Sequence, residues 1–373
     1  MSKVSIVLHD LRGGGAEKMM VRLANQLYND GIDIELVLLT EGGVNFKYVA
    51  EGLSVVELKA PRTLGAFKPL RHYLKARQPD AILSVLTHVN VITALTCLSL
   101  GMTGILSTSE RNTFSLDRKL NNDPTVKLAY WLAPYIYRWL PKPVIAVSNG
   151  VADDLVACSC VRRKDVTSAS NPVITVETRN AAMALPSHPW LLNKEGKKVI
   201  VSVGRLSHQK GYDMLLPALK QAADNSDVRL VIFGEGELRD DLANQAKLLN
   251  IADRVDMPGY TENPIAEVQA ADLFVLSSRF EGSPNGLVEA MSVGTPVVAF
   301  DCPHGPREIL DGGKVAPLVE YKNINALASA IESELNSSVD KATKRQQIIQ
   351  SVSRFSSENS AAEYLKLILP GKQ

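Results

Sequence analysis

Cysteine is scarce in this 373-residue sequence, and long apolar runs are missing. The four cysteines, Cys97, Cys158, Cys160 and Cys302, show no CxxC spacing, and Cys158 and Cys160 are too close together for an easy disulfide. This pattern excludes a disulfide scaffold or a cysteine-rich metal site and fits a reducing compartment. The first residues enter a strand pattern directly, without the apolar stretch of a signal peptide or membrane anchor. We therefore expect a cytoplasmic protein.

The sequence also lacks a large excess of charge of one sign, because its formal net charge is only +1. Residues 1 to 170 hold 20 Lys and Arg against 15 Asp and Glu, a balance of +5, and residues 171 to 373 hold 21 against 25, a balance of −4. This difference is too small for a nucleic-acid-binding face. Either the first half meets an anionic partner or the imbalance is accidental.

Strand patterns alternate with helical patterns along the whole chain, which predicts an α/β fold with doubly wound, mostly parallel sheets. The alternation stops at residues 172 to 196, which are rich in proline and favour a linker between two similar domains. We expect the carboxyl ends of the two sheets to face a central cleft. The expected strands are 3–9, 33–39, 53–58, 80–86, 103–108, 143–147, 198–203, 228–233, 254–257 and 273–276, and the expected helices are 18–29, 66–77, 88–100, 124–139, 149–157, 212–224, 237–249 and 263–270.

The stretch from Ser277 to Leu310 concentrates groups that suit a sugar nucleotide. A buried strand ends just before it, and the following loop carries Glu281. Ser283, Pro284 and Asn285 favour the start of a helix that also carries Glu289. The backbone N–H groups of residues 285 to 288 would then cradle a pyrophosphate, while the carboxylates accept hydrogen bonds from sugar or ribose hydroxyls.

Other strand ends supply further polar groups to the same kind of crevice. Gly13, Gly14 and Gly15 lie between the first strand and the first helix, which suits a phosphate but equally a tight turn. Arg205 and Lys210 follow the first strand of the second domain and could neutralise a pyrophosphate, or they could be solvated surface charges.

Three further residues of the first half lie near expected strand ends. His88 opens a helix after an expected strand, where a structural and a functional role are both open. Glu110 and Arg111 lie just beyond another expected strand and are candidates for binding an acceptor.

The segment 125 to 142 holds five Tyr and Trp residues, and the wider region 111 to 142 holds six basic residues. Such a mixture is typical of a helix at a membrane interface. It is equally compatible with a helix that covers the core and exposes a few aromatic side chains. Pro134 is expected to kink or end the first half of this helix.

Over nearly its whole length, and most strongly in its second half, the sequence resembles the retaining glycosyltransferases of family 4, which have the GT-B fold of two Rossmann-like domains. Glu281 and Glu289 stand in the E-x7-E spacing of that family, within EGSPNGLVEAM. The resemblance continues at Gly14 to Glu17, at Gly204-Arg205 with Lys210-Gly211, and at Gly234 to Gly236. Residues 300 to 309 resemble bacterial members that extend lipid-linked oligosaccharides for the O-antigen of lipopolysaccharide, for capsule or for protein glycosylation.

The resemblance implies a role for each matched residue and a boundary for each domain. Arg205 and Lys210 would contact the donor pyrophosphate, Glu281 the transferred sugar and Glu289 the ribose, with His88 beside the donor sugar. Residues 1–175 would form the acceptor-binding domain, with a C-terminal helix of about 355–373 packed back on it, and residues 176–354 the donor-binding domain. The implied donor-binding set also includes Gly14, Gly15, Gly234, Pro258, Gly259, Tyr260, Asn285, Gly286, Leu287 and Val288.

The resemblance implies a retaining hexosyltransferase that moves a hexose or N-acetylhexosamine from a UDP-sugar to a hydroxyl of a glycan, carried on a polyprenyl diphosphate lipid. No Asp-x-Asp occurs in the sequence, so we expect neither a metal nor a cofactor. Peripheral contact with an anionic membrane at the inner face of the cell membrane is a further expectation. The alternatives are a GT-B UDP-sugar epimerase and a non-catalytic subunit that binds a sugar nucleotide.

Overall fold

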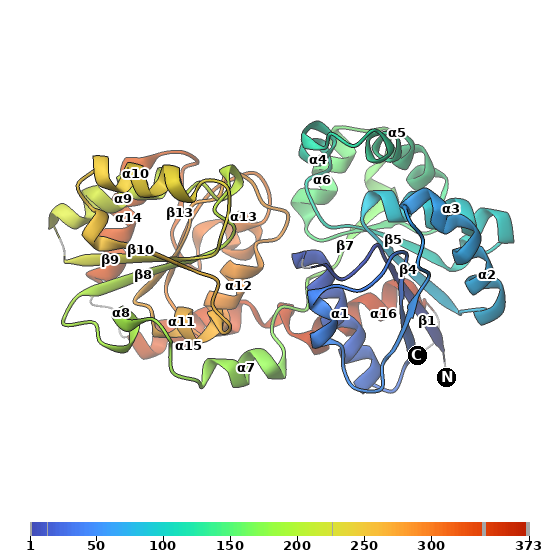
Figure 1. Cartoon of the computed structure of the whole chain (residues 1–373), viewed down its shortest axis with the longest axis horizontal. Coiled ribbons are helices and arrows are strands. Elements are labelled where there is room, and N and C mark those ends of the chain that lie inside the picture. The colour runs from blue at the N-terminus through green and yellow to red at the C-terminus, as the bar shows by residue number, and fades with distance from the viewer. Residues whose placement is uncertain (1, 13, 226, 338–340, 371–373) are drawn as a thin grey trace. The chain divides into compact units, whose positions relative to one another are not determined.

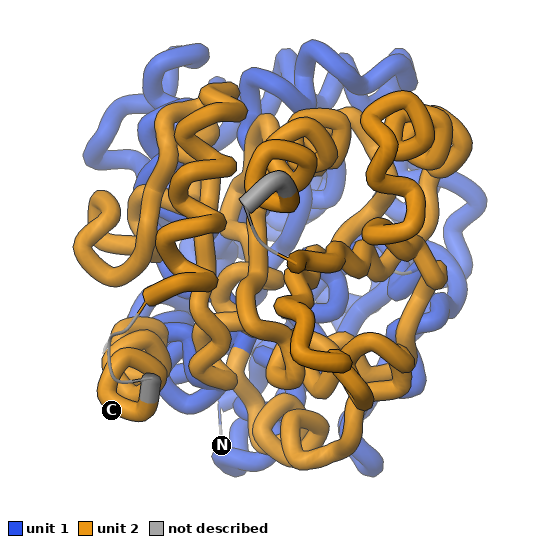
Figure 2. Tube along the Cα trace, turned by 90° about the vertical axis from the view of Figure 1, so that its left-hand side faces the viewer, with its two compact units in different colours: residues 1–173, 355–373 blue, residues 174–354 orange. Residues whose placement is uncertain are grey.

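The chain folds into two compact units, each with its own sheet (Figure 2). The computed structural model describes residues 2–12, 14–225, 227–337 and 341–370. Unit 1 consists of residues 1–173 and 355–373, and unit 2 consists of residues 174–354. The last helix of the chain, α16 (Ser357–Ile368), therefore belongs to the first unit.

Unit 1 is a seven-stranded, fully parallel sheet in the order β3-β2-β1-β4-β5-β6-β7, covered by helices (Figure 1). All six residues of β1 except the first are buried, as expected for a strand covered on both faces. The strands are β1 (Lys3–Leu8), β2 (Asp33–Leu38), β3 (Ser54–Glu57), β4 (Ala81–Val85), β5 (Leu106–Glu110), β6 (Val144–Ala146) and β7 (Val166–Ser168), and the helices besides α16 are α1 (Gly15–Asn29), α2 (Phe67–Arg77), α3 (Thr87–Leu100), α4 (Phe114–Leu120), α5 (Pro124–Trp139) and α6 (Asn149–Ala157).

Unit 2 is a six-stranded parallel sheet in the order β10-β9-β8-β11-β12-β13. Its helices lie on both faces of the sheet (Figure 1). The strands are β8 (Lys198–Val203), β9 (Val228–Phe233), β10 (Val255–Gly259), β11 (Leu273–Leu276), β12 (Val297–Phe300) and β13 (Leu318–Val319), and the helices are α7 (Val176–Ala182), α8 (Pro189–Leu192), α9 (Tyr212–Asn225), α10 (Arg239–Leu248), α11 (Pro264–Ala270), α12 (Asn285–Ser292), α13 (Pro306–Ile309), α14 (Ile324–Leu335) and α15 (Lys341–Ser351).

Both sheets reverse their strand order once, and this reversal decides where a ligand can approach. In unit 1 the chain moves outward from β1 through β2 to β3, and then crosses back to β4 on the other side of β1. In unit 2 it moves from β8 to β10 and crosses back to β11. Connections on either side of a reversal diverge to opposite faces of the sheet, which leaves a crevice at the carboxyl ends of the two central strands. The α/β, doubly wound fold class predicted from the sequence is confirmed.

The segment 172–196, predicted as a linker between the domains, contains the boundary between the two units at Val173 and Ile174, but beyond that boundary it belongs to unit 2 and contains two short helices, α7 and α8. The Thr175 hydroxyl accepts a hydrogen bond from the Thr178 N–H and so caps α7. Pro189 occupies the first turn of α8, after the His188 side chain has accepted a bond from the Trp190 N–H. The prolines here start helices, where their missing N–H costs nothing, rather than marking an irregular chain.

Two further local predictions need correction. The expected strand at 103–108 begins later, because residues Thr103–Ile105 form a 3-10 turn and β5 runs from Leu106 to Glu110. Of the two outcomes expected at Pro134, a kink or an end, the end is wrong, because α5 continues through Pro134 to Trp139, which confirms the helix expected at 124–139. Pro134 lies on the buried side of the helix, where packing against the core favours continuation. No described helix is both long and apolar enough to cross a membrane.

The helix α16 is fastened to unit 1 by a buried polar contact as well as by apolar packing. Tyr364 is fully buried, and its hydroxyl accepts a hydrogen bond from Nη1 of Arg111 at 2.6 Å. The same guanidinium donates to the side-chain oxygen of Asn171. A buried guanidinium must keep its hydrogen-bond partners, since desolvating an unpaired charge is costly.

We therefore expect Tyr364→Phe to destabilise unit 1 by about 1 to 3 kcal/mol, because the buried Arg111 loses an acceptor. Thermal unfolding followed by circular dichroism measures this as a midpoint lower by a few degrees. Lys366→Gln, on the exposed side of α16, is the matched control and should melt like the parent. Equal melting of Tyr364→Phe and the control would contradict the structural role of this contact.

Candidate active site

In unit 2, the carboxyl end of the central strand pair brings Lys210 and Glu281 together. Lys210 follows β8 and Glu281 follows β11, and Lys210 Nζ lies 2.7 Å from Glu281 Oε1. The hydroxyl of Ser278 donates to the same carboxylate oxygen at 2.6 Å. The Glu281 side chain is 7% exposed and that of Lys210 is 22% exposed. The two residues are 71 positions apart in sequence and meet because their strands flank the reversal.

The loop after β8 is fastened to the loop after β11, so the position of the ion pair is rigidly defined. The Ser277 hydroxyl donates to the carbonyl of Lys210 at 2.9 Å, and the Arg279 N–H donates to the carbonyl of Gln209 at 2.7 Å. Gly211 has φ +66°, and a Cβ there would lie 2.2 Å from the carbonyl oxygen of Ser277. Only glycine lets the two loops approach this closely.

Arg279 adds a second fastening by gripping Asp213 on the first turn of α9. Its two terminal nitrogens lie 2.8 and 2.6 Å from the Asp213 carboxylate oxygens. Such a two-pronged contact fixes direction as well as distance. The hydrogen bonds from Arg279 lower the pKa of Asp213, which therefore stays ionised near neutral pH.

The other residues predicted to bind the donor at this edge are less buried than Glu281 or have a structural role. Arg205 is exposed in the loop after β8, and Glu289 is half-buried on α12. The α12 helix begins at Asn285, as predicted. Fewer of its backbone N–H groups than the expected four, those of residues 285 to 288, are available to a pyrophosphate. The N–H groups of Leu287 and Val288 donate to the Pro284 carbonyl, and both side chains are buried in the core. Of these four residues, Asn285 and Gly286 are the two that are partly exposed.

The glycine after β9 is a structural requirement of this edge. Gly234 has φ +144°, and a Cβ there would lie 2.0 Å from the Gly204 carbonyl oxygen. The Gly234 N–H donates to the carbonyl of Gly259 at 2.8 Å, which draws the ends of β9 and β10 together. Beside them, Pro258 is exposed and Tyr260 is 80% exposed, so the Tyr260 ring is accessible to a ligand.

In unit 1, the corresponding edge brings two histidines together. His9 follows β1 and His88 lies in the first turn of α3 after β4, with ring centroids 5.2 Å apart and the rings edge to face. His9 Nδ1 lies 2.8 Å from Asp10 Oδ2, and Arg12 donates to Asp10 from its N–H and its side chain at 2.8 and 2.7 Å. Sequence reasoning missed His9 and Asp10, although a strand that ends in polar residues before a glycine loop is a usable signal.

Burial determines the charge of this histidine cluster. Desolvation, aided by the nearby His9, lowers the pKa of His88 to about 4, so the His88 imidazole is neutral at pH 7. Burial alone would raise the pKa of Asp10, but the hydrogen bonds from Arg12 and His9 lower it below its ordinary value. The edge of unit 1 therefore offers a neutral imidazole beside an ionised carboxylate, both of which can bind sugar hydroxyls.

The glycine loop of unit 1 leads directly into α1. Gly14 is the N-cap residue of α1 with extended backbone, and Gly14 and Gly15 are exposed, while Gly13 lies outside the described residues. Glu17 lies in the first turn, and burial raises its pKa. One of its carboxylate oxygens is buried without a hydrogen-bond partner among the described residues.

Glu110 and Arg111, the predicted acceptor residues, are both buried in unit 1. Glu110 accepts hydrogen bonds from Thr87 Oγ1 at 3.0 and 2.9 Å and from the hydroxyl of Tyr137. Because β5 extends to Glu110, this residue lies in the sheet rather than beyond it. These contacts favour a structural role, and an acceptor-binding role for the two residues stays a prediction.

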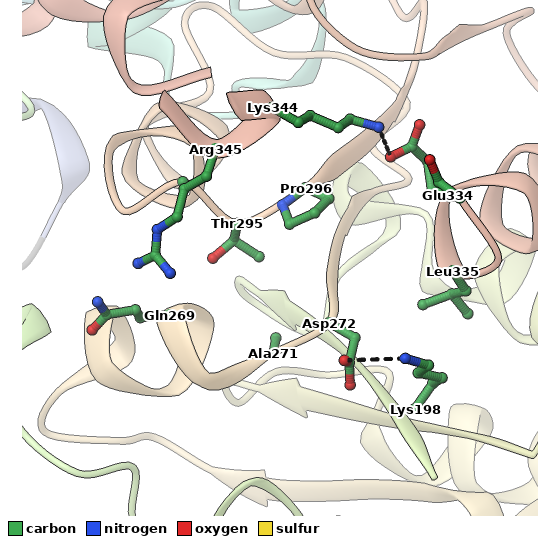
Figure 3. A pocket seen from close by; sticks show the side chains of 12 residues that line it. Lys198, Gln269, Ala271, Asp272, Thr295, Pro296, Glu334, Leu335, Lys344 and Arg345 are labelled. Carbon is green, nitrogen blue, oxygen red and sulfur yellow. Dashed lines mark hydrogen bonds and ion pairs between the residues drawn. The ribbon is translucent and has the colours of Figure 1, made fainter. Parts of the chain in front are cut away.

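A well-formed cavity of about 170 Å³ lies at the opposite edge of the unit 2 sheet (Figure 3). Lys198 at the start of β8 and Asp272 just before β11 line it, with an ion-pair distance of 3.8 Å. Lys344 on α15 pairs with Glu334 on α14 at 2.6 Å. This cavity is at the amino ends of the strands, and four of its charged groups are paired within it. We therefore do not assign the chemistry to it.

Comparison with known proteins identifies the family. Residues 13–177 match the family model described as Glycosyltransferase Family 4, and residues 187–354 match the model described as glycosyl transferases group 1. An uncharacterized glycosyltransferase of Haemophilus influenzae is 26% identical over 344 residues, covering 90% of this chain and 91% of that protein.

Two further comparisons extend over nearly the whole chain. A Campylobacter jejuni protein named GalNAc-alpha-(1->4)-GalNAc-alpha-(1->3)-diNAcBac-PP-undecaprenol alpha-1,4-N-acetyl-D-galactosaminyltransferase is 25% identical over 385 residues, covering 99% of this chain and 98% of that protein. The structure of Anabaena HepE in complex with UDP and glucose has the same fold, with a TM-score of 0.79 at 20% identity over 98% of this chain and 99% of that one.

The chain is thus a glycosyltransferase of the GT-B fold, with a family 4 domain followed by a group 1 domain. The family resemblance expected from the sequence is confirmed.

The buried Glu110 yields a prediction on the pH dependence of stability. Burial raises its pKa to about 7 from an ordinary 4.5, although the Tyr137 and Thr87 hydrogen bonds oppose this. Between these values the folded state keeps a proton that the unfolded state releases, so this contribution to stability is complete below pH 4.5 and is lost as the pH rises through 7. Glu110→Gln should remove this pH-dependent contribution. Relative to the parent, the free energy of unfolding of the variant should therefore rise between pH 5 and 8, by up to about 3 kcal/mol.

Thermal or urea unfolding of both proteins across this pH range measures the effect. Glu51→Gln, at an exposed site, is the control and should show a difference from the parent that does not change with pH. If the difference between Glu110→Gln and the parent is equally flat, Glu110 does not carry the proton.

Proposed function

We propose that the protein is a retaining, metal-independent hexosyltransferase that moves a hexose or N-acetylhexosamine from a UDP-sugar to a hydroxyl of a lipid-linked glycan. The observation that carries this proposal is the pair of the half-buried Lys210 and the buried Glu281 at the strand-order reversal of unit 2. It puts a cation and a carboxylate in one small site, where a sugar diphosphate needs both.

The donor is proposed to bind at the carboxyl edge of unit 2. Lys210 and the exposed Arg205 would offset the charge of the pyrophosphate, and Glu281 would accept hydrogen bonds from the hydroxyls of the transferred sugar. Glu289 on the early turns of α12 would bind the ribose. The uracil would lie against the exposed Pro258 and the exposed ring of Tyr260, next to the buried Gly259.

The carboxyl edge of unit 1 is proposed, by itself, to bind hydroxyl groups of a sugar. Its neutral His88 can accept or donate a hydrogen bond to a sugar hydroxyl without adding charge. Asp10 and the N-terminal turn of α1, with Gly14 and Gly15, would contribute a hydroxyl acceptor and amide donors.

The proposed reaction balances without a protein nucleophile. The oxygen of the acceptor hydroxyl forms a bond to the anomeric carbon on the face from which the diphosphate leaves. The bond between that carbon and the diphosphate oxygen breaks, and its electron pair stays on UDP. The hydroxyl proton passes to the departing phosphate oxygen. Lys210 and Arg205 stabilise the charge that develops there, and Glu281 orients the sugar.

The relatives support the class of donor and acceptor. The Anabaena structure contains UDP and glucose, and the Campylobacter jejuni relative is named for a PP-undecaprenol acceptor. We therefore infer a UDP-sugar donor and a polyprenyl diphosphate glycan acceptor for this chain, acting at the inner face of the cell membrane.

The Lys210–Glu281 pair gives the direct test. Glu281→Gln should lower kcat for sugar transfer by roughly 100-fold to 1000-fold, because the neutral amide neither holds Lys210 nor accepts hydroxyl bonds as strongly. UDP binding, measured by calorimetry, should change by only a few-fold. Glu320→Gln, an exposed residue just after β13, is the control and should transfer sugar at the parent rate.

The same assay, run on a panel of UDP-sugars with and without acceptor, separates the alternatives. A new sugar epimer formed from UDP-sugar alone would establish the epimerase instead. The parent protein, with Glu281 intact, would instead be a non-catalytic subunit if it binds UDP-sugars yet turns none of them over with any acceptor.

Metal independence is tested separately. Because cationic side chains are proposed to neutralise the leaving diphosphate, treatment with EDTA should leave the transfer rate within about twofold of the untreated enzyme. Lys210→Ala should lose far more activity, with or without added Mg²⁺ or Mn²⁺. Loss of transfer in EDTA with recovery on adding Mn²⁺ would overturn this part of the proposal.

A further inference from the structure

Helix α5 carries a row of large apolar side chains on its outer side. Leu128, Trp131, Tyr135 and Trp139 are 50%, 63%, 59% and 58% exposed, and we call these four residues the aromatic stripe. Their spacing of three or four positions puts them on one side of the helix, over about 16 Å at 1.5 Å per residue. The Trp131 and Tyr135 rings lie 5.8 Å apart and pack against each other.

The opposite side of α5 already supplies the core, so the stripe is not needed to hold the helix. Ala129, Tyr130, Ala133 and Tyr137 are buried in an apolar cluster of unit 1. The Tyr130 hydroxyl also donates to Asp117 on α4 at 3.1 Å. Soluble proteins seldom expose a continuous row of Trp and Tyr side chains to solvent, and such a row indicates an interaction site.

The charges around the stripe indicate what it meets. Arg118 and Lys119 at the end of α4, and Lys127 and Arg138 on α5, are all exposed. The exposed acidic residue of this stretch is Asp123, so the balance over residues 118–139 is four positive charges against one negative. Asp123 is committed to capping α5, where it accepts bonds from the N–H groups of Thr125 and Val126.

We propose that the aromatic stripe and its basic rim form a membrane-docking surface that lays α5 flat on an anionic lipid bilayer. Trp and Tyr rings suit the headgroup region, where one end of the side chain is apolar and the other is wet. The lysines and arginines are attracted to anionic headgroups. A protein partner would not need the surrounding excess of positive charge, whereas an anionic bilayer would. The inference goes beyond the proposed function, because binding to lipid requires neither donor nor acceptor.

The tryptophans of this chain give a direct measurement. Two of its three Trp residues are in the stripe, and the third, Trp190, packs under Arg229 in unit 2. In a Trp190→Phe background, vesicles of phosphatidylglycerol at low salt should shift the emission of Trp131 and Trp139 to shorter wavelength. Vesicles of phosphatidylcholine should shift it far less, and added salt should reverse the binding.

Cosedimentation with the same vesicles tests the residues. The double variant Trp131→Ala, Trp139→Ala should bind phosphatidylglycerol vesicles at least about tenfold more weakly, since two large apolar groups no longer enter the interface. The matched control is Met183→Ala, Leu248→Ala in unit 2, which removes two side chains that are 78% and 83% exposed. It should bind like the parent. Circular dichroism verifies that both double variants remain folded.

The proposal is overturned if the parent ignores phosphatidylglycerol vesicles at low salt, or if the stripe variant binds them as tightly as the control. It is equally overturned if analytical ultracentrifugation shows a dimer that the stripe variant loses, because a second copy of the chain would then cover the stripe. Failure of sugar transfer would leave vesicle binding unchanged, so the two proposals fail separately.

Discussion

The position of the candidate active-site groups depends on one constraint, which is the reversal of strand order in a parallel sheet. In unit 2 the loops after β8 and β11 leave the sheet next to each other, so Lys210 and Glu281 meet although 71 residues separate them. In unit 1 the same reversal between β1 and β4 brings His9 beside His88. Each unit therefore presents its polar groups at the carboxyl edge, where loops can vary while the sheet stays fixed.

The Lys210–Glu281 pair is poorly explained by stability alone. Removing two charges from water has a desolvation cost that their mutual attraction often does not offset. Well-packed apolar residues would therefore stabilise the fold at least as well. Ser278 donates to the carboxylate, and Gly211 accepts a left-handed backbone so that the loops can close around it. The cavity at the amino edge differs, since its Lys198–Asp272 pair lies at the amino ends of β8 and β11, opposite the crevice that the reversal opens. A pair that is held this firmly but adds little to stability fits the donor-binding role proposed for it.

The sequence predicted most strands and helices within two or three residues, and it located Glu281, Lys210 and His88 at strand ends. The prediction from sequence failed where the bounds of one strand determine whether a side chain is buried. Because β5 starts at Leu106 after a 3-10 turn, Glu110 lies within the sheet and is buried, and no local pattern reveals that shift. His9 and Asp10 were missed because their importance comes from neighbours on another strand, which one sequence does not show.

Helix α5 illustrates the same limit most clearly. Its aromatic residues occur on both sides, so periodicity alone could not distinguish a core helix from an interfacial one. The structure shows that it is both. Tyr130 and Tyr137 are buried and bound to Asp117 and Glu110, while Trp131, Tyr135 and Trp139 are exposed. The buried tyrosines anchor the helix through polar groups that only the folded unit supplies. Among the residues that the structure describes, the exposed rings make no such polar contacts, and this division by burial, rather than composition, is what supports the interaction proposed for the outer face.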